Sequence, residues 1–176
     1  MKKLEIADFV IRLLTLFAVV CGGWWAWYQY SSSGATDWQN NISISTQVLP
    51  YHDDLRLLVV HVESRNPRPM KFELSSSKHD SFELRVRTLP AGAAVGTVFH
   101  EDEGDLLAQA DLLKLAGGDY IFLPQAEMRD TQVIVVKANT WVSVIAEMKI
   151  HTGTRDANGQ PDVDDNSASA VVYIPK

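Results

Sequence analysis

The apolar residues of this chain are concentrated in one segment near its start. Residues 9–29 carry a single charge, Arg12. A helix of twenty residues spans about 30 Å, which matches the hydrocarbon core of a bilayer. Trp24, Trp25 and Trp27 lie at the far end, where amphipathic rings prefer the membrane interface, and Arg12 lies close enough to the start to reach the headgroups. The pattern predicts a transmembrane helix, a signal anchor, over residues 9–29.

The flanking charges predict the orientation of this helix. Lys2, Lys3 and Arg12 lie at or before its start, and the next basic residue is Arg56. Positive charge is retained in the cytoplasm, so residues 1–8 are expected to form a short cytoplasmic tail and the rest of the chain to be exported. With a bacterial source assumed, the anchor lies in the inner membrane and the carboxy-terminal domain in the periplasm.

Three other interpretations of the apolar segment stay open. A cleavable signal peptide is one, since Ser33 and Ala35 offer small residues for cleavage, although the aromatic run before them is unusual there. A lipoprotein signal needs a small residue before Cys21, where Val20 stands. The third is a buried helix of a soluble protein, which the length and the tryptophans disfavour.

A patch of small residues, Cys21-Gly22-Gly23, lies inside the predicted span. Small residues let two helices approach closely, and a cysteine there can cross-link them. The patch is a candidate for homodimer formation through the anchor.

Beyond a linker over residues 30–40, the pattern changes from helical to alternating. Ile42 and Ile44 alternate with serines, as in a half-buried strand, and the apolar run from Leu55 predicts a central strand covered on both faces. Strands are expected over residues 42–48, 55–64, 70–74, 82–89, 95–99, 120–123, 131–137, 141–151 and 170–174, with a hairpin at 138–140.

One segment has helical spacing instead. Asp105 is a suitable cap, Leu106 to Leu113 contains apolar residues at helical intervals, and Gly117-Gly118 ends the pattern. Many short strands with one brief helix predict an antiparallel β-sandwich over residues 41–176, of immunoglobulin- or fibronectin-III-like type. A small lipocalin-like β-barrel is the alternative.

Composition narrows the function classes. Hydrophobic residues make up 46% of the 176, which is typical of a folding chain, and the net charge of −6 argues against a nucleic-acid partner. The single cysteine lies in the predicted span, so neither an internal disulfide nor a cysteine zinc site is expected.

The acidic segment from Asp156 to Asn166 is the most specific local pattern. Asp156, Asn158, Asp162 and Asp164 place oxygen-bearing side chains at even spacing, as calcium loops do, and the segment resembles EF-hand-like and thrombospondin-type acidic loops. Glycine is not at the sixth position and no glutamate stands at the twelfth. A solvated hairpin loop between the last two strands is the favoured interpretation, since Asp, Asn, Gly and Pro are also the residues that form turns. Calcium is the one cofactor considered.

Arg65, Arg68 and Lys71 form a basic cluster in an otherwise acidic domain, and they are candidates for binding an acidic partner. Signals for catalysis are weak. No G-x-S-x-G elbow, Walker loop or HExxH pair occurs, and the nearest approaches, Ser75–Asp80 and His100-Glu101, fit ordinary polar loops.

These observations favour a non-enzymatic bitopic envelope protein. Its exported sandwich is expected to bind another membrane or envelope protein, as an accessory or scaffold subunit, an inference by analogy with other sandwich domains. The alternative is a ligand-sensing ectodomain that binds a small molecule and is coupled to a membrane partner. An enzyme with a spatially assembled site is the third class.

Overall fold

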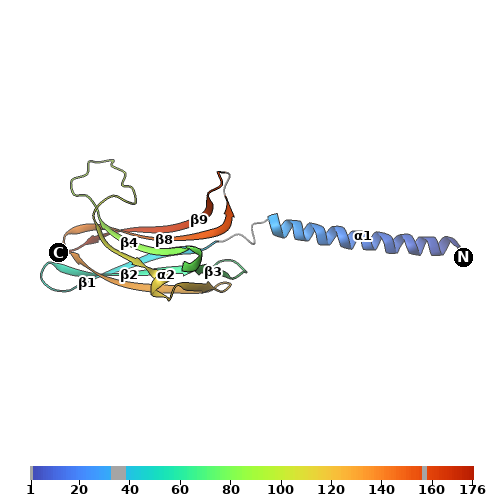
Figure 1. Ribbon diagram of the computed structural model, residues 1–176, viewed down its shortest axis with the longest axis horizontal. Helices are drawn as coiled ribbons and strands as arrows, with labels where there is room; N and C mark the ends of the chain where they lie inside the picture. Colours follow the sequence, from blue (N-terminus) through green and yellow to red (C-terminus); the bar gives the residue numbers. More distant parts are fainter. Residues whose placement is uncertain (1, 33–38, 156–157) are drawn as a thin grey trace. The chain divides into compact units, whose positions relative to one another are not determined.

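The computed structural model describes residues 2–32, 39–155 and 158–176, and the chain divides into two units. The first, Met1–Asp37, contains the long helix α1 (Lys2–Ser32). The second, Trp38–Lys176, is mostly β-structure with antiparallel sheets and one short helix, α2 (Leu112–Leu115) (Figure 1). The predicted span therefore lies within one continuous apolar helix.

The described strands form three sheets, and all their pairings are antiparallel. The first sheet has the order β1-β2-β7, with β1 (Asn41–Pro50), β2 (Leu55–Arg65) and β7 (Glu127–Lys137). The largest has the order β5-β4-β8-β9, with β5 (Leu106–Asp111), β4 (Ser81–Thr88), β8 (Thr140–Arg155) and β9 (Pro161–Ile174). In the third, β3 (Phe72–Ser75), which the turn η1 (Ser76–Lys78) follows, pairs with β6 (Asp119–Phe122).

Alternating side chains of the two larger sheets share one hydrophobic core. On β2, Leu58, Val60 and Val62 are fully buried, and the residues between them remain partly exposed. On β4, Phe82, Leu84 and Val86 are buried in the same alternating way. Each such apolar side chain contributes about 1.5–3 kcal/mol to folding. The core is completed by residues from β8, α2 and β6: Leu112, Leu113, Tyr120, Phe122, Val142, Val144, Ala146 and Met148.

The alternative of a lipocalin-like barrel is wrong, because the described strands form open sheets and no closed barrel. The prediction that the strand from Leu55 is covered on both faces is also wrong. Leu57 and Val59, on the face opposite the core, are partly exposed. An apolar run does not by itself show that a second layer covers its outer face.

The predicted helix after Asp105 is wrong over most of its length. Residues Leu106–Asp111 are β5, which pairs with β4. The helix begins only at Leu112, and Asp111 caps it, because its Oδ1 accepts a hydrogen bond from the Lys114 nitrogen at 3.0 Å. Pairing with a neighbouring strand outweighs the local helical spacing of a few leucines.

Three smaller expectations also differ from the structure. Residues 95–99 form no strand. Residues 138–140 form no hairpin, because β7 and β8 belong to different sheets; Asn139, at φ 58°, connects the two layers. The acidic segment is not a loop throughout, since Pro161 begins β9 and Asp162 to Asn166 lie in that strand.

A partly buried hydrogen bond links β6 to β7. The Tyr120 hydroxyl donates to both carboxylate oxygens of Asp130, at 2.9 and 3.0 Å. Burial and the neighbouring carboxylate raise the pKa of the Tyr120 hydroxyl above its usual value of 10. Burial also raises the pKa of Asp130, and the hydrogen bond from Tyr120 partly opposes that change.

This pair predicts a loss of stability at alkaline pH. The unfolded chain releases the Tyr120 proton near pH 10, while the folded chain retains it, so the unfolding free energy falls as the pH rises above that value. Tyr120→Phe should remove this contribution, and at neutral pH it should cost about 1–2 kcal/mol because Asp130 loses its donor. Urea unfolding of the full chain in detergent from neutral to alkaline pH measures both effects. Tyr51→Phe, at an exposed tyrosine, should follow the wild type.

Candidate functional site

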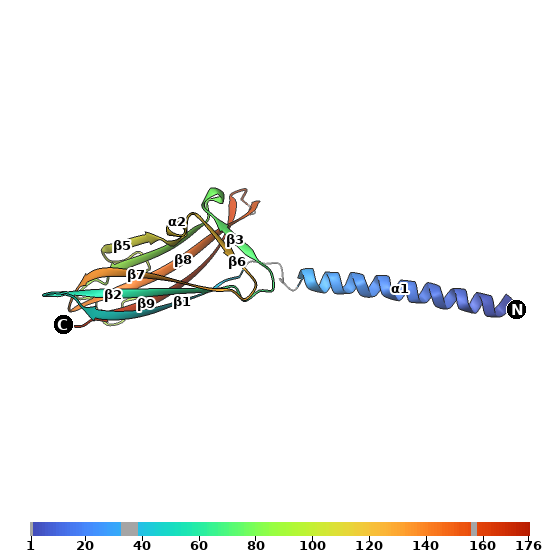
Figure 2. The same ribbon diagram turned by 90° about the horizontal axis from the view of Figure 1, so that it is seen from below.

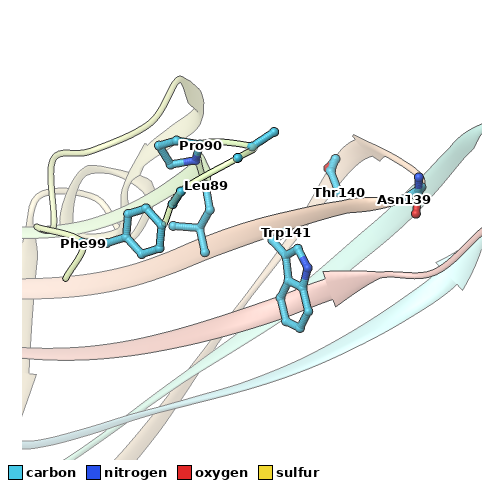
Figure 3. Close-up of a pocket in the computed structure, with 9 residues that line it drawn as sticks. Leu89, Pro90, Phe99, Asn139, Thr140 and Trp141 are labelled. Atoms are coloured by element: carbon cyan, nitrogen blue, oxygen red, sulfur yellow. The ribbon is translucent and has the colours of Figure 1, made fainter. Parts of the chain in front are cut away.

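An uncharged hollow lies where the β4–β5 loop meets the start of β8 (Figure 3). Its volume is about 450 Å³, within the range of small-molecule and peptide pockets. None of the residues that line it carries a charged side chain. They are Leu89, Pro90, Ala91, Gly92, Ala93, Phe99, Asn139, Thr140 and Trp141.

Apolar and aromatic side chains form the walls. Leu89, Pro90 and Phe99 gather on the loop side, and Trp141 lies on the β8 side (Figure 3). The Trp141 side chain is 53% exposed because it lies on the outer face of β8, and the Tyr173 ring of β9 lies 5.0 Å from it. The Leu89 nitrogen donates to the Trp141 oxygen at 2.9 Å, which holds the loop against the strand.

The connection between β7 and β8 supplies the polar end of the hollow. The Asn139 nitrogen donates to the Ile174 oxygen at 2.7 Å, and its Oδ1 accepts from the Tyr173 hydroxyl, also at 2.7 Å. The Thr140 hydroxyl oxygen is buried and has no hydrogen-bond partner within the described residues. The hollow therefore offers apolar and aromatic walls without a charged side chain, which suits a neutral occupant with an apolar face.

Backbone contacts close the base of the β4–β5 loop. The Thr88 nitrogen donates to the Asp105 oxygen at 2.9 Å, and Arg87 Nη1 donates to the Gly104 oxygen at 3.1 Å. Gly104 has a φ of +88°, and a Cβ at this position would lie 1.7 Å from the Thr88 oxygen. Only glycine fits here, so this residue determines how the loop returns to the sheet.

The predicted anchor residues lie on α1. In the described part of the chain, Ile11–Gln29 is the one window long and apolar enough to cross a membrane, and none of it is buried. Trp24, Trp25 and Trp27 are each more than 60% exposed, and the Trp24 and Trp27 rings lie 5.7 Å apart. Arg12 is also exposed, near the start of this window. By length and composition, this helix could therefore span a membrane.

The small-residue patch lies on the same exposed surface. The Cys21 thiol is free and exposed, and a Cβ added at Gly22 or Gly23 would meet nothing within 4 Å. The patch is therefore open to a second helix, and pairing through it stays a prediction.

In the basic cluster, Arg65 is the last residue of β2, whereas Arg68 and Lys71 lie in the β2–β3 loop. Two of the three head groups contact other side chains. Arg65 donates to Gln125 Oε1 at 3.2 Å, and Lys71 Nζ lies 2.9 Å from Glu73 Oε1. The hydrogen bond and the charge of Lys71 lower the pKa of Glu73. Arg68 is half-buried, and within the described residues its Nε has no hydrogen-bond partner. A role in docking stays a prediction for all three.

A buried asparagine holds this loop in place. Asn66 is fully buried, and its Nδ2 donates to the Met70 oxygen at 2.7 Å and to the Leu123 oxygen at 3.1 Å. Its Oδ1 accepts from the Arg68 nitrogen at 2.9 Å. The sequence pattern indicated only a turn here, because nothing local shows which carbonyl groups Asn66 contacts.

The predicted calcium ligands are distributed along the end of the β8–β9 hairpin. Asp156 lies outside the described residues, Asn158 lies in the turn, and Asp162 and Asp164 lie on β9. Asp162 Oδ2 accepts from Thr152 Oγ1 at 3.2 Å and Thr154 Oγ1 at 3.0 Å. Among the residues with described positions, no three histidine, cysteine or acidic side chains gather as a metal site would require. Calcium binding stays a prediction.

The sequence interpretation missed the hollow. Its members are distant in the chain, with Leu89 and Phe99 in one loop and Trp141 on a later strand. One local signal existed: alternation with the buried residues Val142 and Val144 places Trp141 on the solvent face, where a large aromatic residue is unusual.

Comparisons with known proteins leave the function open. No protein-family model matches the chain, and no curated protein matches it. A solved structure that resembles the fold is a crystal structure described as ApaA from Bordetella pertussis. It has 10% sequence identity and a TM-score of 0.49, and the match covers 78% of this chain and 95% of that one. A likeness this remote carries no argument about function.

The glycine at the loop base provides a test of how the hollow is held. Gly104→Ala should destabilise the domain by about 3 kcal/mol, because both the positive φ and the contact with Thr88 oppose a Cβ. Gly92→Ala is the matched control. Gly92 also has a φ of +88°, but open space surrounds it, so the cost should be about 1 kcal/mol. Thermal unfolding measures the difference, and equal losses would contradict the role of Gly104.

Proposed function

We propose that this protein is a single-pass membrane protein of the bacterial envelope. Its amino terminus lies in the cytoplasm, α1 crosses the inner membrane, and the β-domain projects into the periplasm. Two features support this: the fully exposed apolar window Ile11–Gln29 and the basic residues Lys2 and Lys3 before it. In this arrangement, the three exposed tryptophans lie at the membrane–water interface, which amphipathic aromatic rings prefer.

We further propose that the domain is an antiparallel β-sandwich of the immunoglobulin- or fibronectin-III-like type. The shared core between the β1-β2-β7 sheet and the β5-β4-β8-β9 sheet supports this assignment. Antiparallel sheets packed face to face as two layers are typical of that class.

The β-domain is proposed to bind another envelope protein, as a non-enzymatic accessory or scaffold subunit, without a cofactor and without nucleic acid. The observation that carries this proposal is the uncharged hollow with Trp141 on its wall. Tryptophan in a desolvated pocket is the residue type that most often dominates a protein interface. An apolar side chain of the partner would fill the space.

A ligand-sensing domain is the second candidate, and the same hollow favours it. A volume of about 450 Å³ accommodates a small neutral molecule as well as a side chain. Binding of this molecule would then change the interaction of the protein with a membrane partner.

A reporter fusion tests the orientation. Alkaline phosphatase, which is active only after export, should be active when joined after Lys176. A fusion active only in the cytoplasm would contradict the orientation and the export of the domain.

Substitution of the tryptophan tests the binding site. Full-length protein carrying Trp141→Ala, purified from membranes in mild detergent, should retain at least tenfold less co-purifying partner than the wild type. Ile121→Ala is the control, because Ile121 is 58% exposed but lines no part of the hollow. If both variants retain the partner equally, the hollow is not the binding site.

The same variants separate the two candidates. A sensor predicts that Trp141→Ala abolishes a ligand-dependent rise in melting temperature while the partner is retained. A docking domain predicts the loss of the partner with no such ligand.

A further inference from the structure

Strand β7 lies at an open edge of its sheet. In the order β1-β2-β7, its one strand neighbour among the described residues is β2 (Figure 2). At the other side of the two larger sheets, the edge strands β1 and β9 lie beside each other. Asn166 of β9 donates a hydrogen bond to the Asn40 oxygen, just before β1. β7 is eleven residues long, whereas β5, at the free edge of the four-stranded sheet, has six. A long unprotected edge strand presents a row of unpaired backbone groups.

The hydrogen bonds at the two ends of β7 reveal which backbone groups point outward. The Ala138 nitrogen donates to the Asp54 oxygen, and the Ala126 oxygen accepts from the Asn66 nitrogen. In an antiparallel strand, the nitrogen and oxygen of one residue point to the same side, and successive residues alternate. The backbone N–H and C=O groups of the even-numbered residues of β7 therefore point toward β2. Those of the odd-numbered residues, from Glu127 to Lys137, point toward the open edge.

Apolar surface accompanies this edge on both faces of the strand. Val133 and Val135 are 58% and 51% exposed on the outer face. On the inner face, Gln132 and Ile134 line a hollow of about 190 Å³, which lies between β7 and the strands β4 and β5. A strand added to β7 would bury the valines further and cover this hollow.

We propose that the occupant is β7 of a second copy of this chain, added antiparallel with Gln132 on the two-fold axis. In this register, each Glu127 lies directly opposite the partner's Lys137, so both ends of the interface carry unlike charges. The outward residues pair with one another, Arg129 opposite the partner's Val135 and Thr131 opposite the partner's Val133. About a dozen backbone hydrogen bonds would form.

Neighbouring registers are less favourable. A shift of two residues in one direction places Arg129 opposite the partner's Lys137, and like charges directly opposite each other destabilise a sheet. A shift of two in the other direction leaves Glu127 opposite the partner's Val135, without an ion pair. A shift of one would turn the outer face of one copy toward the inner face of the other. The charges at the strand ends therefore select one register.

This self-pairing uses a surface different from the Trp141 hollow, so it goes beyond the proposed docking function. It joins two three-stranded sheets into one continuous six-stranded sheet, and the exposed valines of both copies form one surface.

Disulfide trapping tests the register directly. In a Cys21→Ser background, Gln132→Cys places one thiol in each copy at a non-hydrogen-bonded pair, where the Cα atoms are about 4.5 Å apart, within disulfide reach. Val135→Cys is the control on the same strand. It is more exposed, but the two cysteines would be about 20 Å apart because residue 135 lies opposite residue 129.

Full-length protein in detergent should cross-link at least about tenfold faster through Gln132→Cys than through Val135→Cys. Equal rates, or no cross-link through Gln132→Cys in a variant that melts like the wild type, would overturn the proposal. Adding Trp141→Ala should not change the result, so failure of the docking function and failure of self-pairing can be told apart.

Charge reversal provides an independent test. Glu127→Lys and Lys137→Glu each place like charges at both ends, and each should weaken self-association about tenfold. The double variant should restore it, and so should an equal mixture of the two single variants, because the mixed pair has unlike charges at both ends. Sedimentation of the full chain in the Cys21→Ser background measures this. If the double variant self-associates no more strongly than the single variants, the proposed register is wrong.

Discussion

The β-domain depends on one constraint, the period of two in side-chain direction along β2, β4 and β8. Leu58, Val60 and Val62 on β2 face Val142, Val144 and Met148 on β8 across one shared core. A shift of one residue in any of these strands would move its whole apolar set to the solvent side. The inner faces account for most of the burial, so the outer faces constrain the fold less. The Trp141 hollow lies on an outer face, and the exposed strand β7 lies at an edge.

Local alternation explains which elements could be predicted. The strands around Ile42 and Phe82 show apolar and polar residues in alternation, and their positions follow from the sequence alone. The segment from Leu106 could not be assigned in this way. Its leucines fit a helix equally well, and only the presence of β4 beside it decides for a strand. The break at Asn139 was interpreted as a hairpin because a turn residue looks the same whether the chain returns to the same sheet or crosses to another.

The same limit applies to the candidate sites. The anchor is continuous in sequence, so its apolar length and tryptophans could be found without a structure. The hollow brings together Leu89, Phe99 and Trp141 from separate parts of the chain, and its position depends on the close return of the loop at Gly104. The open edge of β7 is equally invisible in sequence, because strand order decides which strands lack a neighbour.

The connection of the anchor to β1 has a mechanical consequence. The chain enters the domain at Asn41, and β1 pairs with β2 from Asn41↔Arg65 to Pro50↔Arg56 without a break. A force applied at Asn41 along the axis of β1 would therefore load all rungs of this ladder together, whereas a force across the strand would open them one after another. The mechanical resistance of the domain at this entry point thus depends on the direction in which β1 is pulled.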